Sequence, residues 1–377
     1  LPPQVHKLES ARLYGNIAGY NYYFVDITVG SPPQRVSVIL DTGSGLLAFP
    51  CAGCPHCGKH IDPLFDFGRS TSATWVRCDS RECTGDRRSK CRGRGSDHCG
   101  YSQGYLEGSS ISGWWFLDYL HMGDSIQRNP PVYAKMGCHQ NENKLFYTQA
   151  ANGIFGIQGQ QSVLHTFFAD KGHVDSSAFS ICLAVEGGAL TVGGHNESVH
   201  AGPLQYIKQL GSGYGVEVSS LAVGTASIPI EHKYNAIIDS GTTYTYLNRK
   251  HYQALRKAIE DHCGNGRCSA VQHGDCWEVR GGLDHFPQVE VTFDHSVRTA
   301  WWPREYMYQR GSKWCYSFKD DGMRPTTTLG ASWMLYKEII FDLANKRIGV
   351  APARCPSYVK RPDHFSDADR IRPPDAS

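Results

Sequence analysis

Two short segments of the sequence each end an apolar run on a single acidic residue. They read VILDTGS at residues 38–44 and AIIDSGT at residues 236–242, so Asp41 and Asp239 are each followed by a hydroxyl residue, a glycine and a second hydroxyl residue. A carboxylate at the end of a buried strand is costly unless it is partnered, and the hydroxyl groups can donate hydrogen bonds that orient it. Two such loops predict a facing pair of carboxylates, which can hold one proton between them and perform general acid–base chemistry. The simpler alternative is that both aspartates only cap turns.

Similar elements surround the two aspartates. A strand, a turn and a second strand are expected over residues 22–40 before the first aspartate and over residues 216–238 before the second. An apolar–apolar–Gly segment, Ile154-Phe155-Gly156, follows the first aspartate, and the parallel segment Thr328-Leu329-Gly330, counted with it although Thr328 carries a hydroxyl group, follows the second. Two copies of one supersecondary unit predict an internally duplicated fold.

The remaining pattern is that of a strand-rich protein with few helices. Forty glycines, nineteen prolines and many short runs of Val, Ile, Thr and Tyr indicate strands joined by tight turns. Amphipathic helices are expected over residues 160–171 and 248–262, where apolar residues recur at helical spacing. The first eleven residues show no pattern, and the chain after Cys355 is predicted to be a disordered tail.

Length and composition indicate a soluble protein of two domains. The chain has 377 residues, of which 40% are hydrophobic and 20% charged, and this is enough for two separate cores. A net charge of +2 gives no electrostatic reason to expect a nucleic-acid partner. No run approaches the roughly twenty apolar residues needed to span a membrane, and no signal peptide is found in the sequence. We therefore expect a mature or trimmed ectodomain, and any membrane anchor would belong to a longer chain.

The fourteen cysteines form an even set. In an oxidising compartment they would make up to seven disulfides, which we favour over metal or redox sites. The block from residue 51 to residue 99 holds an odd number of them, so at least one must pair outside the block. The alternative is a zinc site, whose ligands would be Cys51, Cys54, Cys57, His56 and His60. That spacing differs from the two separated ligand pairs of ordinary structural zinc sites.

A hairpin candidate lies between the two aspartates, at residues 100–118. Together with both Asp segments and both apolar–apolar–Gly segments, it resembles the pepsin-type aspartic proteases, in the same order from about residue 13 to residue 356. The resemblance implies a mostly β, bilobal fold of two duplicated β-barrel-like lobes, with a few short helices and an active-site cleft between the lobes. The implied division is an N-terminal lobe (12–200) with a Cys-rich insertion (51–99) and a flap (100–118), a C-terminal lobe (201–356) and a polar tail (357–377).

The family's chemistry is implied in the same way. Asp41 and Asp239 would activate a shared water for attack on a peptide carbonyl, with no metal, no cofactor and no covalent intermediate. Six residues would support this dyad by bracing the loops and orienting the carboxylates: Thr42, Gly43, Ser44, Ser240, Gly241 and Thr242.

The hairpin would be the flap that closes over the substrate. Tyr105 would be its tyrosine, and the alternative is an ordinary surface aromatic residue in a hairpin. Many family members carry a tryptophan after the first Asp motif that hydrogen-bonds the flap tyrosine. This chain has Ala48 there, so its flap must be held in another way.

Three segments resemble the plasmepsin V group of apicomplexan aspartic proteases more narrowly: FPCAGCPHCG at 49–58, YLEGS at 105–109 and MGCH at 136–139. The Cys-rich insertion is shared more loosely with the nepenthesin-like plant enzymes. Members of the plasmepsin V group cleave after Leu in Arg-x-Leu export motifs early in the secretory pathway. The resemblance therefore implies such polypeptide substrates and a Golgi or endoplasmic reticulum lumen location, with which the single sequon at Asn196, a candidate glycosylation site, agrees. Leu106 is a departure, because that group has a cysteine there.

Two glutamates are candidates for reading the substrate arginine. Glu107 and its neighbour Gly108 lie at the expected flap tip, and Glu142 lies in a polar loop after Cys138. A substrate arginine suits a fork of desolvated carboxylates, so we expect these three residues and Tyr105 to bind substrate. The alternative is that both glutamates are solvated loop residues.

Disulfide connectivity cannot be deduced from spacing alone. Taken with the family resemblance, the expected pairs are Cys51–Cys138, Cys54–Cys57, Cys78–Cys91, Cys83–Cys99, Cys182–Cys355, Cys263–Cys268 and Cys276–Cys315.

Three functions compete at this point. The first is a selective, monomeric endopeptidase of the secretory pathway that acts on Arg-x-Leu motifs. The second is a broad-specificity acid protease of nepenthesin type, which would cut denatured globin at low pH without any arginine. The third is a catalytically silent binding protein on the same fold, since a fold does not fix function. Both Asp motifs are intact, which disfavours the third.

Overall fold

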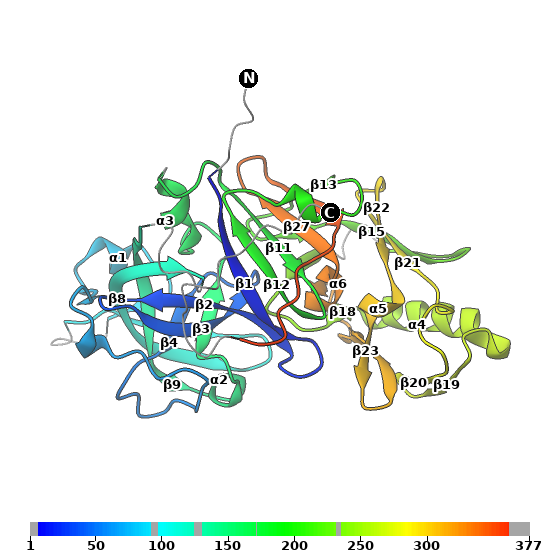
Figure 1. The fold of residues 1–377 in the computed structure, drawn as a ribbon, viewed down its shortest axis with the longest axis horizontal. Coiled ribbons are helices and arrows are strands. Elements are labelled where there is room, and N and C mark those ends of the chain that lie inside the picture. The colour runs from blue at the N-terminus through cyan, green and yellow to red at the C-terminus, as the bar shows by residue number, and fades with distance from the viewer. Residues whose placement is uncertain (1–6, 92–96, 124–129, 171, 231–234, 362–377) are drawn as a thin grey trace, which may run out of the picture.

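The computed structural model describes residues 7–91, 97–123, 130–170, 172–230 and 235–361. In Figure 1 the first half of the chain lies at the left and most of the second half at the right, with β1, β11, β12 and β27 between them. Strands dominate, and the helices are few and mostly short. The expectation of a mostly β, pepsin-like fold is confirmed.

The largest sheet in the described residues has 15 strands and takes them from both halves of the sequence. Its order is β13-β28-β27-β11-β12-β1-β2-β3-β10-β4-β9-β8-β7-β6, and β5 pairs with β8. The bounds of these strands are β1 (Glu9–Asn16), β2 (Tyr22–Val29), β3 (Gln34–Asp41), β4 (Leu47–Pro50), β5 (Thr74–Trp75), β6 (Ser89–Lys90), β7 (Gly100–Gly104), β8 (Ser110–Met122), β9 (Val132–Glu142), β10 (Gly153–Gly156), β11 (Ala178–Leu183), β12 (Glu186–Val192), β13 (Gln205–Lys208), β27 (Lys337–Asp342) and β28 (Arg347–Pro352).

Smaller sheets build most of the second half. The first has the order β14 (Gly215–Val216), β17 (Ala236–Asp239), β26 (Thr327–Gly330), β18 (Thr245–Leu247) and β25 (Phe318–Asp320). The second has the order β16 (Ala226–Pro229), β15 (Val218–Val223), β21 (Val289–Phe293) and β22 (Val297–Trp301). The third has the order β19 (Ala270–His273), β20 (Cys276–Val279), β24 (Lys313–Tyr316) and β23 (Met307–Arg310).

Short helices connect these strands. They are α1 (Arg81–Thr84), α2 (Leu145–Thr148), α3 (Leu164–Ala169), α4 (Arg249–Cys263), α5 (Pro303–Tyr306) and α6 (Ala331–Met334), with single 3₁₀ turns at Phe67–Arg69, Glu197–Val199 and Gly264–Gly266. As the sequence predicts, Asn248 caps α4, its side-chain oxygen accepting from the Lys250 amide at 3.1 Å. The other expected helix is shorter than residues 160–171, and residue 171 itself lies outside the described residues.

The internal duplication is visible in the pairing of the strands that carry the aspartates. Strand β10 lies parallel to β3, with Gly156 opposite Asp41. Strand β26 lies parallel to β17, with Gly330 opposite Asp239. Each apolar–apolar–Gly segment therefore runs beside the strand that delivers an aspartate, which explains why the sequence repeats both parts together.

Two parts of the chain are more ordered than the sequence indicates. Residues 9–16, within and beyond the stretch expected to be unpatterned, form β1, which pairs with both β2 and β12. The start of the expected disordered tail, residues 356–361, packs on the first half. Ser357 and the Tyr358 amide donate to the Glu186 carbonyl, and Arg361 makes ion pairs further along. The rest of that tail lies outside the described residues.

Arg361 is held by two buried carboxylates. Its guanidinium donates to both oxygens of Asp26 at 2.7–2.9 Å and to Asp62 at 2.6 Å. Asp62 also accepts from Arg35 at 3.0 Å. Asp26 and Asp62 are 1% and 4% exposed, so removing the guanidinium would leave buried charge without its partner.

We predict that Arg361→Ala lowers the free energy of unfolding by about 3 kcal/mol, because breaking a buried ion pair leaves an uncompensated charge. Denaturant unfolding at neutral pH measures this. The matched control is Lys360→Ala at the exposed neighbouring position. An Arg361→Ala variant as stable as this control would contradict the assignment of residues 356–361 as a structural strap.

Candidate active site

The two aspartates lie at the ends of their strands and face each other. Asp41 is the last residue of β3, and Asp239 is the last residue of β17. A Cβ atom added to Gly43 would lie 2.7 Å from Cγ of Asp239, and one added to Gly241 would lie 2.7 Å from Cγ of Asp41. Each carboxyl group thus rests against the glycine of the opposite loop, where any side chain would displace it.

Hydroxyl groups cross between the two loops. Thr42 donates its hydroxyl to the Ile238 carbonyl at 2.9 Å and accepts from the Ser240 amide at 2.9 Å. Ser240 does the same in return, to the Leu40 carbonyl at 2.7 Å and from the Thr42 amide at 3.1 Å. Thr42 and Ser240 are buried, at 0% and 1% exposed. These four bonds fix the separation of the two aspartates.

Local donors orient each carboxylate in the same way. Asp41 accepts from the Gly43 amide at 2.7 Å and from the Ser44 hydroxyl. Asp239 accepts from the Gly241 amide at 3.0 Å and from the Thr242 hydroxyl at 2.6 Å. The inner oxygens take the amides and the outer oxygens the hydroxyls, so both carboxylates present the same edge to the space between them.

The pair cannot readily carry two negative charges. Burial, followed by the charge of Asp239, raises the pKa of Asp41 to about 8, although Ser44 and the Gly43 amide oppose the rise. Near neutral pH the two carboxyl groups therefore hold a proton between them, and this titration belongs to the pair. One group can then accept a proton while the other donates one.

The flap hairpin consists of β7 and β8. Its turn is closed by bonds from the Tyr105 amide to Ser109 at 2.9 Å and from the Gly108 amide to Tyr105 at 3.0 Å, with Gly108 at φ +91°. The Tyr105 hydroxyl is buried, and its pKa is raised by burial and then by the charge of Asp41. The role of Tyr105 as the flap tyrosine over the dyad stays a prediction.

Aromatic packing holds this flap where the tryptophan is absent. Ala48 is fully buried, and its Cβ and the Tyr101 ring both lie against Gly137. The Tyr105 ring packs on Phe146 of α2, with centroids 5.0 Å apart. Tyr101 and Phe146 were not predicted from the sequence, since neither belongs to a chemical motif. The four-residue spacing of Tyr101 and Tyr105 was the only signal.

Glu142 is not where the sequence analysis expected it to act. Its side chain is fully buried and accepts from His139 at 2.7 Å, from His60 at 3.1 Å and from the Gly58 amide at 2.9 Å. Burial alone would raise the pKa of this carboxyl group, but these donors lower it to about 2. The structure therefore does not place Glu142 in a fork with Glu107, because its oxygens are occupied inside the protein.

Glu107 remains exposed at the flap tip beside Gly108. The Lys144 ammonium lies against the same turn, 2.5 Å from where a Cβ of Gly108 would be. Of the residues expected to bind arginine, Glu107 is thus the one with a free carboxylate facing solvent.

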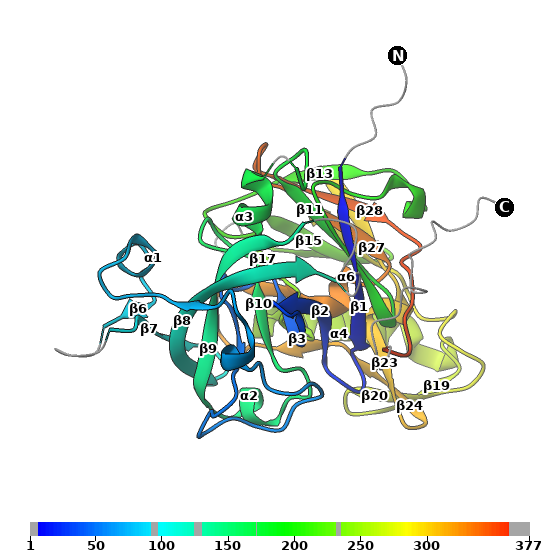
Figure 2. The same ribbon diagram turned by 60° about the vertical axis from the view of Figure 1, so that its left-hand side comes forward.

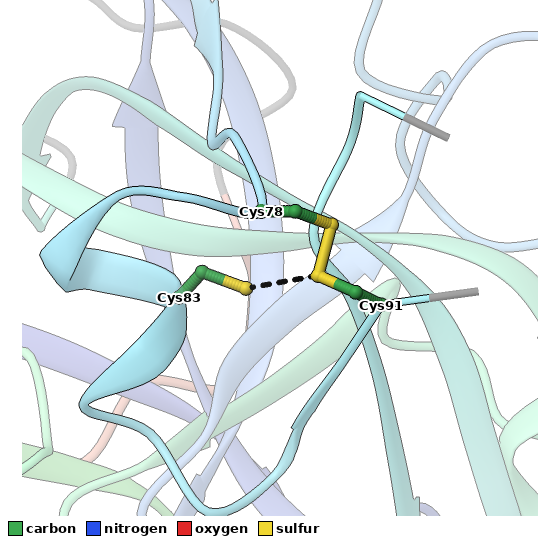
Figure 3. Close-up of side chains that lie close together, drawn as sticks. All are labelled: Cys78, Cys83 and Cys91. Atoms are coloured by element: carbon green, nitrogen blue, oxygen red, sulfur yellow. Dashed lines mark hydrogen bonds between the residues drawn. A yellow bond between two sulfur atoms is a disulfide. The ribbon is translucent and has the colours of Figure 1, made fainter. Parts of the chain in front are cut away.

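All fourteen cysteines lie in the described residues and are paired. The structure has the pairs named from the sequence: Cys51–Cys138, Cys54–Cys57, Cys78–Cys91, Cys83–Cys99, Cys182–Cys355, Cys263–Cys268 and Cys276–Cys315. Figure 3 shows three sulfurs, of Cys78, Cys83 and Cys91, that lie within 4.8 Å of one another. They are disulfide partners rather than free thiols, and free thiolates are what a zinc ion binds. The end of the insertion that carries α1 and β6 projects from the side of the molecule in Figure 2.

Other candidate sites lie away from the two aspartates. Asn196 is exposed, and its side chain accepts from Ser198. A cavity of about 450 Å³ is lined by residues of the second half, and one of about 440 Å³ is lined by residues of both halves, among them Asn16 and Glu186. Arg304 and Tyr336 line both cavities, and neither is lined by an aspartate of the pair. Among the described residues no helix is long and apolar enough to cross a membrane.

The fold and the facing aspartates agree with comparisons to known sequences. The family described as eukaryotic aspartyl protease matches residues 22–353, so this chain belongs to that family of peptide-bond hydrolases. It is 37% identical over 374 residues to Aspartic protease 5 of Toxoplasma gondii and 25% identical over 457 aligned positions to Plasmepsin V of Plasmodium falciparum. It is 28% identical over 374 residues to the Arabidopsis thaliana protein Aspartic protease in guard cell 2.

These alignments cover 93%, 94% and 93% of this chain, respectively. They cover 38% of the Toxoplasma protein, 75% of Plasmepsin V and 76% of the plant protein. The chain therefore spans little more than a third of the Toxoplasma protein and about three quarters of each of the other two.

We predict that Asp41→Asn abolishes peptide cleavage, by about three orders of magnitude in kcat, and also stabilises the fold near neutral pH. The raised pKa of Asp41 means that its contribution to stability is complete below about pH 4 and is lost as the pH rises through about 8. The variant should therefore gain on the order of 2 kcal/mol over the wild type at pH 7 and much less at pH 4.

Thermal unfolding of both proteins across this pH range measures the difference. Asp79→Asn, at a carboxylate that is 74% exposed, is the control and should show no such trend. A gain of equal size at pH 4 and pH 7 would show that Asp41 does not carry the shared proton.

Proposed function

We propose that this chain is an aspartic endopeptidase whose dyad is Asp41 and Asp239. The observation that carries the proposal is the mutual placement of the two carboxyl groups, each against the glycine of the other loop. Thr42, Ser44, Ser240 and their counterparts support the dyad by the hydrogen bonds described above. A protein that only binds peptides would have no need of two buried carboxyl groups that share a proton.

The proposed mechanism uses both protonation states of the pair. The ionised carboxylate takes a proton from a water held between the two groups, and this water attacks the peptide carbonyl carbon. The protonated carboxyl group donates a hydrogen bond to the oxyanion that develops. A proton from the dyad then passes to the leaving amine, which returns the pair to its starting state. Tyr105 covers the reacting peptide and excludes water.

For specificity we propose cleavage after Leu in Arg-x-Leu motifs, with Glu107 as the residue that reads the arginine. Its exposed carboxylate on the flap tip can form a bidentate pair with a guanidinium, which a lysine cannot reproduce. The similarity to Plasmepsin V over nearly the whole chain supports this assignment. Glu142 is left out because its carboxylate is taken.

We also propose a location in the lumen of the secretory pathway, in the Golgi or the endoplasmic reticulum. Seven disulfides persist only where the redox environment is oxidising. The exposed sequon at Asn196 agrees with this environment. The similarity to plant aspartic proteases keeps one alternative open, a broad-specificity acid protease.

We predict that Glu107→Gln reduces the preference for Arg-x-Leu over Lys-x-Leu peptides by about tenfold, the equivalent of one charge-assisted hydrogen bond. The loss should fall mainly on kcat/KM of the arginine peptide. Steady-state cleavage of the two peptides, near neutral pH and in acid, measures it.

Glu197→Gln is a matched control, since its side chain is 82% exposed and lies far along the chain from the flap. An unchanged preference in Glu107→Gln would remove Glu107 from arginine recognition. Cleavage of denatured globin in acid without any need for arginine would favour the broad-specificity alternative.

A further inference from the structure

A cluster of titratable side chains lies outside the dyad, where the Cys-rich insertion meets the base of the flap. Its centre is Glu142, the last residue of β9. Its neighbours are His139 on the same strand and His60 in the insertion, and all three side chains are 0% exposed. No step of the proposed mechanism uses them, yet fully buried ionisable groups are costly and need a reason.

Both ring nitrogens of His60 have a polar partner. Its Nδ1 atom lies 3.1 Å from the Gln149 carbonyl, which can only accept. Its Nε2 atom lies 3.1 Å from Oε2 of Glu142, a carboxylate that also accepts from the Gly58 amide. Both ring nitrogens of His60 therefore lie within hydrogen-bond distance of an oxygen, and its contact with Glu142 is buried on both sides.

His139 behaves differently. Its Nδ1 atom donates to Oε1 of Glu142 at 2.7 Å, and its buried Nε2 has no hydrogen-bond partner among the described residues. Burial lowers the pKa of His139, so one proton on Nδ1 is the state that fits. The remaining group that faces Glu142 is the buried phenol of Tyr101 on β7, whose pKa burial raises. The Glu142 carboxylate is thus held by two imidazole rings and one backbone amide.

This anion joins two elements that come from different parts of the sequence. The Glu142 amide donates to the His56 carbonyl at 2.8 Å, and the Glu142 carboxylate is hydrogen-bonded to the Gly58 amide and to His60. The insertion is therefore bound at three points. On its other side Glu142 is paired with Ile111 of the flap strand β8.

The next residue continues this link to the flap. The Asn143 side chain accepts from the Ser110 amide at 2.7 Å and donates to the Ser110 hydroxyl at 2.8 Å. Ser109, which precedes it, accepts from the Tyr105 amide through its carbonyl. A short chain of hydrogen bonds therefore connects the buried carboxylate to the flap tyrosine.

We propose that Glu142 is a positioning residue, which through its buried pair with His60 anchors the flap to the Cys-rich insertion and sets the position of Tyr105 over the dyad. This inference rests on the proposed function only in taking the flap to cover the substrate. It replaces the idea that Glu142 contacts the substrate arginine. The insertion then has a catalytic purpose, as the fixed support of the flap.

The pH dependence follows from the sign of the shift. The pKa of Glu142 is lowered to about 2, so the anchor is complete above about pH 4.5, the ordinary carboxyl range, and is lost only as the pH falls toward 2. The ratio of wild-type activity to that of an uncharged variant should be constant above pH 5 and shrink in acid. Titration of the dyad affects both proteins and cancels in this ratio.

The test uses Glu142→Gln, which keeps the shape but removes the charge, and two peptides, one with Arg-x-Leu and one with Ala-x-Leu. We expect kcat/KM to fall about tenfold, chiefly through kcat. The fall should be the same for both peptides. Hydrogen exchange of the flap amides at residues 104–110 should become faster. His60→Gln should reproduce both effects although it lies outside the flap, and His56→Gln, an exposed neighbour that contributes only its backbone oxygen, should reproduce neither.

Each other outcome overturns the proposal. A loss confined to the arginine peptide would show that Glu142 reads the substrate directly. Unchanged cleavage and unchanged flap exchange would show that the cluster has no influence on the flap. If Glu142→Gln does not fold, His60→Gln decides by the same criteria. Failure of the arginine specificity itself is separate, since it would appear as equal cleavage of both peptides by the wild type.

Discussion

The active site depends on holding two carboxyl groups against each other in a buried place. Electrostatics opposes this arrangement, because two like charges at this separation repel and both lose hydration. The crossed hydrogen bonds of the Thr42 and Ser240 hydroxyls counteract this repulsion, because they tie each loop to the backbone of the other and do not bind the carboxylates. The carboxyl groups are therefore free to share a proton, and their separation is fixed by strands β3 and β17 whatever their charge. The parallel strands β10 and β26 keep these two strands in place.

The two Asp loops and the flap that lies near them are built in different ways. The Asp loop is made twice by the same local pattern, whereas the flap is supported by elements that occur once: the insertion, the end of β9 and α2. With Ala48 small, Tyr101 and Phe146 fill the space behind Tyr105 with aromatic rings. The proposed chemistry uses the duplicated parts, whereas the proposed arginine recognition and flap support use elements that occur once.

The sequence predicted those features whose cause is local. The two Asp segments, the adjoining strands and the cap of α4 at Asn248 each follow from a few neighbouring residues. What it could not show depends on partners distant in the chain. His60 is 82 residues from Glu142, and Arg361 is 335 residues from Asp26, so neither environment leaves a trace in the local pattern. Strand β1 escaped notice because Glu9, an apparently exposed residue type, is buried in it. A polar residue type says little about burial when its partner is unknown.

The bond between Cys182 and Cys355 closes the whole second half of the protein into a covalent ring, whose ends are 173 positions apart in the sequence. A single backbone nick anywhere inside this ring releases no fragment, since both products still share the bridge. Such a nick, including one the enzyme makes in itself, would leave the apparent mass unchanged on a non-reducing gel. It would become visible only after reduction, when the two pieces separate. A non-reducing gel therefore does not show whether the backbone of this segment is intact.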